Sequence, residues 1–144
     1  MERLICKSLL WKIGFPNRED YNKTLDEIFL ANSNNDMLLE LESCSSNCET
    51  TFDILQQYWK YECNDFSVDT FGKCLLEDLK TMYFSNIFPI ENYAKMCYVL
   101  WQQLPSELNT IEPFHTLSYA DDPLSWSDEK LTRKLYEELF EFYK

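Results

Sequence analysis

The chain has 144 residues, of which 45% are hydrophobic and 16% aromatic, so it is long and apolar enough to fold as one domain with a buried core. Its formal charge of −12 excludes nucleic acid as a ligand, because so acidic a surface repels phosphates. Only two glycines are present, which argues against a many-turned β-fold and against a glycine-rich phosphate-binding loop.

The N-terminal part of the chain predicts two helices. Charged and apolar side chains alternate at helical spacing, which indicates an amphipathic helix over residues 4–12. Gly14 can adopt the left-handed conformation that ends a helix, and Pro16 forbids its continuation. We expect the second helix to begin at Asn17 or at Asp20.

The next stretch contains a turn, a short helix and a helix start. The Asn- and Asp-rich residues 32–36 predict a turn, because these side chains bond their own backbone. A short third helix is expected over residues 37–42. Thr50 followed by Asp53 resembles an N-terminal capping pair, so we expect a fourth helix to begin there.

Two further helices are predicted before the periodicity stops. The fifth covers residues 71–83, and Gly72 inside it predicts a close contact with another helix, since glycine weakens a helix by about 1 kcal/mol relative to alanine. The sixth lies between Pro89 and Pro105. Its apolar residues reach almost all the way round the helix, so we expect it to be the central helix, covered on most sides.

After the sixth helix the chain shows no periodicity for about twenty residues. We expect an irregular link that apolar side chains hold to the helices and that presents Asp121 and Asp122 at a turn. Ser125 and Asp128 resemble another capping pair. The final helix carries one apolar stripe, formed by Leu131, Leu135, Leu139 and Phe142.

Consecutive helices joined by short polar links favour antiparallel packing. We therefore predict an all-α chain in which residues 1–144 form a single helical domain, an antiparallel bundle of about six to seven helices. A HEAT-like helical stack is the second choice, because no strict repeat is present.

The cysteines and the N-terminus indicate a compartment. No run of 18 apolar residues occurs and no export signal is recognisable, so we expect a cytoplasmic protein without membrane contact and with reduced cysteines. Cys44, Cys48, Cys63 and His115 could be assembled into a zinc site. Their spacing departs from the usual ligand patterns, however, and we expect neither a metal nor a cofactor.

No catalytic signature is recognisable. The one histidine, His115, is more typical of a hydrogen-bonding structural residue than of a general base. Asp121 and Asp122 offer only two hard oxygen ligands, whereas calcium takes about six to eight. We therefore predict a binding protein rather than an enzyme.

The placement of the negative charge indicates the kind of partner. Residues 29–126 hold fifteen acidic and four basic residues, a net charge of −11, and such a field would steer a basic protein into contact. A solvated face that keeps the protein soluble is the simpler alternative. The candidate partner-binding residues are six acids and one aromatic anchor, namely Asp53, Glu62, Asp65, Asp69, Asp121, Asp122 and Trp126. Further candidate anchors are Tyr58, Trp59 and Tyr61.

Several short stretches of the second half stand out together. They are Met82-Tyr83, Asn-Ile-Phe-Pro at 86–89, Leu104-Pro105, Ser-Tyr-Ala-Asp-Asp-Pro-Leu-Ser-Trp-Ser-Asp at 118–128, and a final Leu-Tyr-Glu-Glu-Leu helix. This arrangement resembles small bacterial immunity proteins, which are encoded beside polymorphic or contact-dependent toxins. The resemblance implies a cytoplasmic protein that covers the active site of a cognate toxin domain, often a basic nuclease. It identifies no individual binding residue.

Two other hypotheses fit the same acidity. A nucleic-acid mimic that inhibits a DNA-binding enzyme would space its carboxylates like duplex phosphates along an elongated surface. A structural or adaptor helical domain would carry the acids only as a solvated face.

Overall fold

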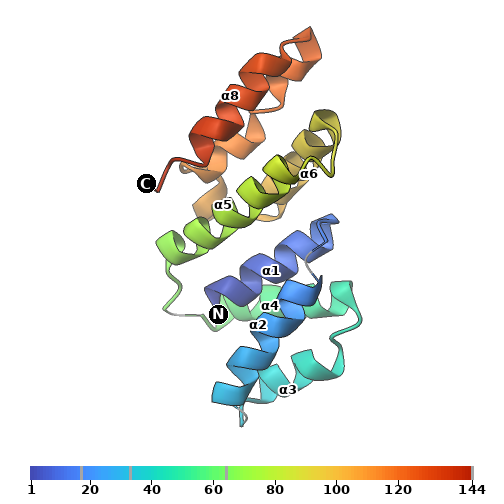
Figure 1. Cartoon of the computed structure of the whole chain (residues 1–144). Helices are drawn as coiled ribbons and strands as arrows, with labels where there is room; N and C mark the ends of the chain where they lie inside the picture. The colour runs from blue at the N-terminus through green and yellow to red at the C-terminus, as the bar shows by residue number, and fades with distance from the viewer. Residues whose placement is uncertain (17, 33, 64, 144) are drawn as a thin grey trace. The chain divides into compact units, whose positions relative to one another are not determined.

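A computed structural model describes residues 1–16, 18–32, 34–63 and 65–143 (Figure 1). All regular structure in these residues is helical, which confirms the all-α prediction. The chain divides into two compact units, Met1–Phe71 and Gly72–Lys144, called unit 1 and unit 2 below. The prediction of a single domain stays a prediction, and each unit is described by itself.

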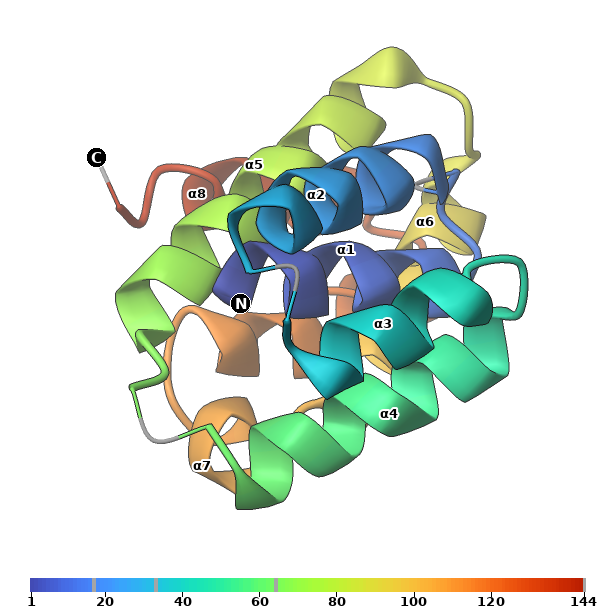
Figure 2. The same ribbon diagram turned by 90° about the horizontal axis from the view of Figure 1, so that it is seen from below.

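Unit 1 is built around its first helix. It contains α1 (Glu2–Ile13), α2 (Arg18–Ala31), α3 (Asp36–Ser43), α4 (Cys48–Tyr61) and the first turn of α5 (Val68–Ser85). Helix α1 packs against α2 and α4, and α3 packs against the same two helices (Figures 1 and 2). Every residue from Leu4 to Leu10 is buried, so α1 is the enclosed helix of this unit. Its buried lysine, Lys7, has its amine 3.9 Å from the Asp20 carboxylate.

The helix ends of unit 1 follow local chemistry, though not always at the predicted residue. Gly14 ends α1 in the left-handed conformation, with φ of 116°, as predicted. The start of α4 was predicted wrongly: Asn47, and not Thr50, is the N-cap, because the Asn47 side chain accepts a hydrogen bond from the Thr50 amide. The helix therefore begins at Cys48, two residues before the predicted cap. Asp20 lies inside α2, and Asn17 and Ser33 lie outside the described residues.

Unit 2 combines three long helices with three short ones. The long helices are the rest of α5, α6 (Ile90–Gln103) and α8 (Glu129–Leu139); the short ones are α7 (Ser106–Asn109) and the 3₁₀ helices η1 (Phe114–Ser118) and η2 (Asp122–Trp126). Helix η1 contacts α6 and α7, and η2 contacts α8. Most residues of helix α6 are buried or half-buried. Its exposed residues are polar except for Tyr98, which was expected to widen the apolar face and is 36% exposed.

The short helices of unit 2 occupy the segment that was expected to be irregular. Proline lies at the start of each one, at Pro105, Pro113 and Pro123, where its missing amide costs no hydrogen bond. Phe114 and Leu117 are fully buried and hold the segment in place. The prediction that apolar side chains hold this segment to the helices is therefore confirmed. The prediction that the segment has no regular structure is wrong.

Helix α8 buries a face that is rotated from the predicted stripe and shares Leu139 with it; Tyr136 and Phe140, which were expected to flank the stripe, are buried. Its buried residues are Thr132, Tyr136 and Leu139, while Leu131 is 37% exposed and Phe142, beyond the helix end, is 49% exposed. The Tyr136 ring packs edge-on against Tyr93 with centroids 5.2 Å apart, and this aromatic contact sets the rotation of the helix. Asp128 caps α8 by accepting a hydrogen bond from the Leu131 amide; the Ser125 hydroxyl instead donates to the Asp122 carbonyl.

Gly72 makes a close contact, although its partner is not the helix that was predicted. A Cβ atom at this residue would clash with the Tyr143 hydroxyl, so glycine leaves room for the tyrosine ring on α5. The contact comes from the C-terminal turn of unit 2 and not from a neighbouring helix.

No disulfide joins the cysteines in the described part of the chain. No helix in the described part of the chain is both long and apolar enough to cross a membrane.

Candidate partner-binding surfaces

The net charge of unit 1 is confined to one stretch. Residues 36–69, called acidic segment 1 below, hold eight acidic residues and one lysine, a net charge of −7, while the rest of the unit is electrically balanced. The ion pairs of α1 and α2 join Arg3 to Glu27 and Lys7 to Asp20. Among the described residues, no carboxylate of acidic segment 1 forms an ion pair. Internal lysines and arginines therefore leave this charge unneutralised.

Unit 2 shows the same separation. Residues 105–128, called acidic segment 2, hold five acidic residues and no lysine or arginine, and the remaining residues of the unit carry no net charge. The ion pairs within α8 join Arg133 to Glu129 and Lys134 to Glu138. No carboxylate of acidic segment 2 takes part in an ion pair in the part of the chain that the structure describes.

The four candidate acids of unit 1 do not form one compact group. Asp53 lies exposed on α4, and Glu62 follows the last residue of that helix. These two residues are nine positions apart, about two and a half helical turns, so their side chains leave α4 on opposite sides. Glu62, Asp65 and Asp69 are all exposed and lie close in sequence around the α4–α5 connection. Asp69 is also in the first turn of α5, where the helix dipole favours an acid.

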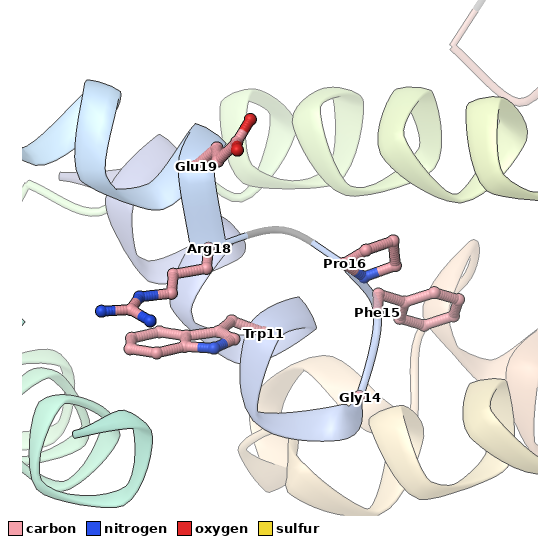
Figure 3. A pocket seen from close by; sticks show the side chains of 6 residues that line it. All are labelled: Trp11, Gly14, Phe15, Pro16, Arg18 and Glu19. Carbon is pink, nitrogen blue, oxygen red and sulfur yellow. The ribbon is translucent and has the colours of Figure 1, made fainter. Parts of the chain in front are cut away.

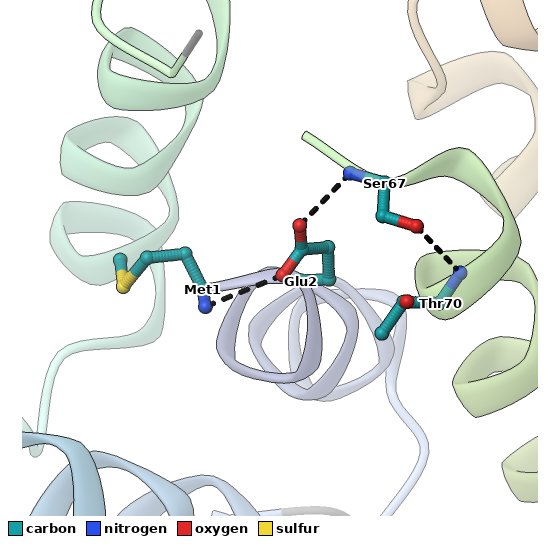
Figure 4. A network of polar contacts seen from close by, with 4 residues as sticks. All are labelled: Met1, Glu2, Ser67 and Thr70. Carbon is teal, nitrogen blue, oxygen red and sulfur yellow. Dashed lines mark hydrogen bonds and ion pairs between the residues drawn. The ribbon is translucent and has the colours of Figure 1, made fainter. Parts of the chain in front are cut away.

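A hydrogen-bond network holds the start of α5 and thereby positions Asp69 (Figure 4). The Ser67 amide donates to Glu2 Oε1 over 2.9 Å, and the Thr70 amide donates to the Ser67 hydroxyl over 3.2 Å. The N-terminal ammonium lies 3.5 Å from Glu2 Oε2. Burial alone would raise the pKa of Glu2, but the hydrogen bonds from backbone amides and the ammonium outweigh it and lower the pKa.

Replacing Glu2 by alanine is expected to destabilise the protein at neutral pH by about 1 kcal/mol, because the Ser67 amide loses its charged acceptor. A carboxyl whose pKa is lowered by folding stabilises the protein above its ordinary pKa, and this contribution disappears as the pH falls through the lowered value. Urea unfolding of the wild-type protein and of Glu2→Ala at several pH values should therefore show a difference in the free energy of unfolding that vanishes in acid. Glu40→Ala, which removes an exposed acid, is the matched control. An equal loss of stability in Glu40→Ala would contradict the stabilising role of the hydrogen bonds to Glu2.

One of the three candidate anchors in unit 1 is clearly exposed. Tyr61 is 66% exposed at the last residue of α4. Trp59 instead packs against Phe66 and Phe71, with ring centroids 5.1 and 5.2 Å apart, and Tyr58 is also partly buried. Of these three candidate anchors, Tyr61 is therefore the one that the structure leaves exposed.

In unit 2 the candidate residues gather in η2. Asp122 opens this 3₁₀ helix and is exposed, and Trp126 closes it with 60% of its surface exposed. Asp121 directly precedes them but is only half-exposed, and its Oδ1 atom is buried without a hydrogen-bond partner among the described residues. Burial, and to a smaller extent the neighbouring charge of Asp122, raise the pKa of Asp121. No residue pattern around Asp121 indicates that one of its carboxylate oxygens is buried.

Two other acids of acidic segment 2 have structural partners. The Thr116 hydroxyl donates to Glu112 Oε2, and the Tyr119 hydroxyl donates to Glu112 Oε1 over 3.4 Å. Asp128 caps α8. Among the described residues, Asp121, Asp122 and Glu107 in α7 therefore remain as the acids of this segment whose carboxylates accept no side-chain hydrogen bond and cap no helix.

His115 shows no arrangement suited to catalysis. Its side chain is exposed, and its Nδ1 atom lies 3.5 Å from the Ser118 hydroxyl oxygen. That hydroxyl donates its proton to the His115 carbonyl over 2.6 Å, so it is not held as a nucleophile for the imidazole.

An open hollow lies at the α1–α2 connection, which the sequence did not indicate (Figure 3). Its lining residues are Trp11, Gly14, Phe15, Pro16, Arg18 and Glu19. The Arg18 guanidinium lies 6.0 Å from the centroid of the Trp11 ring, and Trp11 in turn packs on Tyr21. The hollow contains one acid, one base and none of the predicted binding residues, and we assign it no ligand.

Comparisons with protein-family models, curated proteins and solved structures gave no match for this chain. Its function is therefore inferred from the charges, exposed side chains and hydrogen bonds of the two units.

Proposed function

We propose that this protein is a non-catalytic acidic inhibitor, an immunity protein that neutralises a cognate basic toxin domain by covering its active site. One observation supports the proposal most: the net charge of each unit is confined to a single segment whose carboxylates form no ion pair among the described residues. Carboxylates left unpaired in the free protein are available to the lysines and arginines of a partner.

The exposed aromatic side chains would supply the binding energy that the surface charges alone do not provide. Surface acids act mainly on the association rate and on the choice of partner, whereas buried aromatic anchors provide most of the binding energy. Acidic segment 1 exposes Tyr61 and acidic segment 2 exposes Trp126. Each segment thus combines a negative field with one large anchor.

Blocking a nuclease follows from the same chemistry. An enzyme that binds a polyanionic substrate needs a basic surface around its active site. An acidic protein that docks on this surface competes with the substrate without carrying out a reaction. Such an inhibitor needs no nucleophile, metal or general base of its own.

Co-expression with the product of the neighbouring gene tests the proposal. The neighbouring gene alone should arrest growth, and this protein should restore growth and co-purify with the toxin in a pull-down. A neighbouring product without toxicity, or toxicity that persists when this protein is present, would contradict the proposed function.

A further inference from the structure

We propose that Asp121 is an acid-sensitive latch between η2 and α8: when its carboxylate takes up a proton, the neutral acid moves inward and bonds the buried Tyr136 hydroxyl. The latch holds the part of acidic segment 2 that displays Asp122 and Trp126. It is a property of the fold of unit 2 and does not depend on the proposed function.

Unit 2 contains buried polar atoms without a hydrogen-bond partner among the described residues. Thr132 and Tyr136 are fully buried and lie four residues apart on α8, so they share one face of that helix. Neither hydroxyl forms a hydrogen bond. The Oδ1 atom of Asp121, directly before η2, is buried in the same condition, and η2 packs against α8. Buried polar atoms are nearly always hydrogen-bonded, so these three are unusual.

The titratable groups that face the Asp121 carboxylate are neutral or negative. They are Cys97 from α6, Tyr136 from α8 and the neighbouring Asp122. Burial raises the pKa of the Cys97 thiol to about 12 and raises the pKa of the Tyr136 hydroxyl, so both groups are neutral at physiological pH. An ionised Asp121 therefore finds no compensating charge in the interior and stays half-exposed.

Protonation reverses this preference. A neutral carboxylic acid loses most of the cost of leaving water and gains a proton that it can donate. The Tyr136 hydroxyl oxygen accepts that hydrogen bond, so both groups obtain a partner.

The sign of the resulting pH dependence follows from the same groups. Burial, and to a smaller extent the charge of Asp122, raise the pKa of Asp121 in the folded protein. The folded protein therefore takes up this proton at a pH at which the unfolded chain does not. Ionised Asp121 destabilises the fold at neutral pH, and this penalty disappears as the pH falls through the raised pKa.

An NMR titration of the side-chain carboxyl groups in the full-length protein, between about pH 4 and 8, tests the latch directly. Asp121 should titrate at a higher pH than the exposed Asp122, and the backbone amides of η2 should follow the Asp121 titration. In Tyr136→Phe the Asp121 midpoint should move down towards that of Asp122, because the hydrogen bond to the neutral acid is lost.

Thermal unfolding of variants tests the consequence for stability. Asp121→Asn is a permanent mimic of the neutral acid, so its melting temperature at neutral pH should exceed that of the wild-type protein by about 2–4 °C. The difference should vanish near about pH 4, where the wild-type carboxylate is protonated. Glu107→Gln, which removes an exposed acid of the same segment, is the matched control and should show no such convergence.

Two results would overturn the latch. One is an Asp121 midpoint at or below that of Asp122. The other is a Tyr136→Phe variant that loses as much stability at neutral pH as in acid, which would show that the hydroxyl has only a structural role. The latch predicts instead that Tyr136→Phe is at least as stable as the wild-type protein at neutral pH, where the hydroxyl has no partner among the described residues, and less stable in acid.

Discussion

Replacing Phe114 by alanine is expected to lower the free energy of unfolding by about 3–5 kcal/mol, the largest stability effect that we predict. Phe114 is fully buried at the start of η1. The short helices α7, η1 and η2 have four or five residues each, too few to be stable without tertiary contacts. Removing the ring therefore leaves a cavity under the segment that displays Asp122 and Trp126. Urea unfolding followed by circular dichroism measures the loss.

Ile111→Ala is the control for this substitution. Ile111 belongs to the same segment but is 43% exposed, so its truncation should change the free energy of unfolding by less than about 1 kcal/mol. Similar unfolding midpoints for Phe114→Ala and the wild-type protein would show that burial of this ring does not hold acidic segment 2 in place.

Neutralising acidic segment 2 is expected to have the largest effect on binding. The triple variant Glu107→Gln, Asp121→Asn, Asp122→Asn should associate with the basic partner about tenfold more slowly at low ionic strength, because the attractive field weakens. The dependence of the association rate on salt should weaken as well. Stopped-flow or surface plasmon resonance measurements with the neighbouring gene's product give both quantities.

A second triple variant controls for the total charge. This variant also removes three negative charges, but from residues 129–144, where acids and bases are balanced. Its substitutions are Glu137→Gln, Glu138→Gln and Glu141→Gln. It should slow association much less. Equal slowing by the two variants would show that only the net charge matters, and a weak salt dependence of the wild-type protein would favour the adaptor hypothesis.

Much of the fold was predictable because its signals are local. The spacing of apolar residues located the long helices, and Gly14 ends α1 as its backbone freedom predicts. Cap positions were less predictable, because several Asn, Ser, Thr and Asp residues lie near each helix start. In α4 the Asn47 side chain takes the role that the sequence assigned to Thr50.

The errors in unit 2 come from tertiary contacts. Which face α8 buries depends on the rings of Tyr83 and Tyr93 on other helices, so the stripe of leucines located the buried face only in part. The short helices of residues 106–126 are stabilised by burial of Phe114 and Leu117 and have no periodicity long enough to recognise.

The candidate binding residues were only partly predictable for the same reason. Exposure of Asp53, Glu62, Asp65 and Asp69 follows from their charge. The separation of Asp53 from Glu62 follows from helix geometry, whereas the inward turn of Asp121 depends on the packing of η2 against α8. Their role in binding stays a prediction.

Hydrogen–deuterium exchange of the protein with and without the neighbouring gene's product tests the central claim most directly. We expect the partner to slow exchange at backbone amides of residues 36–69, 105–128 or both, where the unpaired carboxylates lie. Protection confined to the balanced helices α1, α2 and α8, with both acidic segments unchanged, would contradict it.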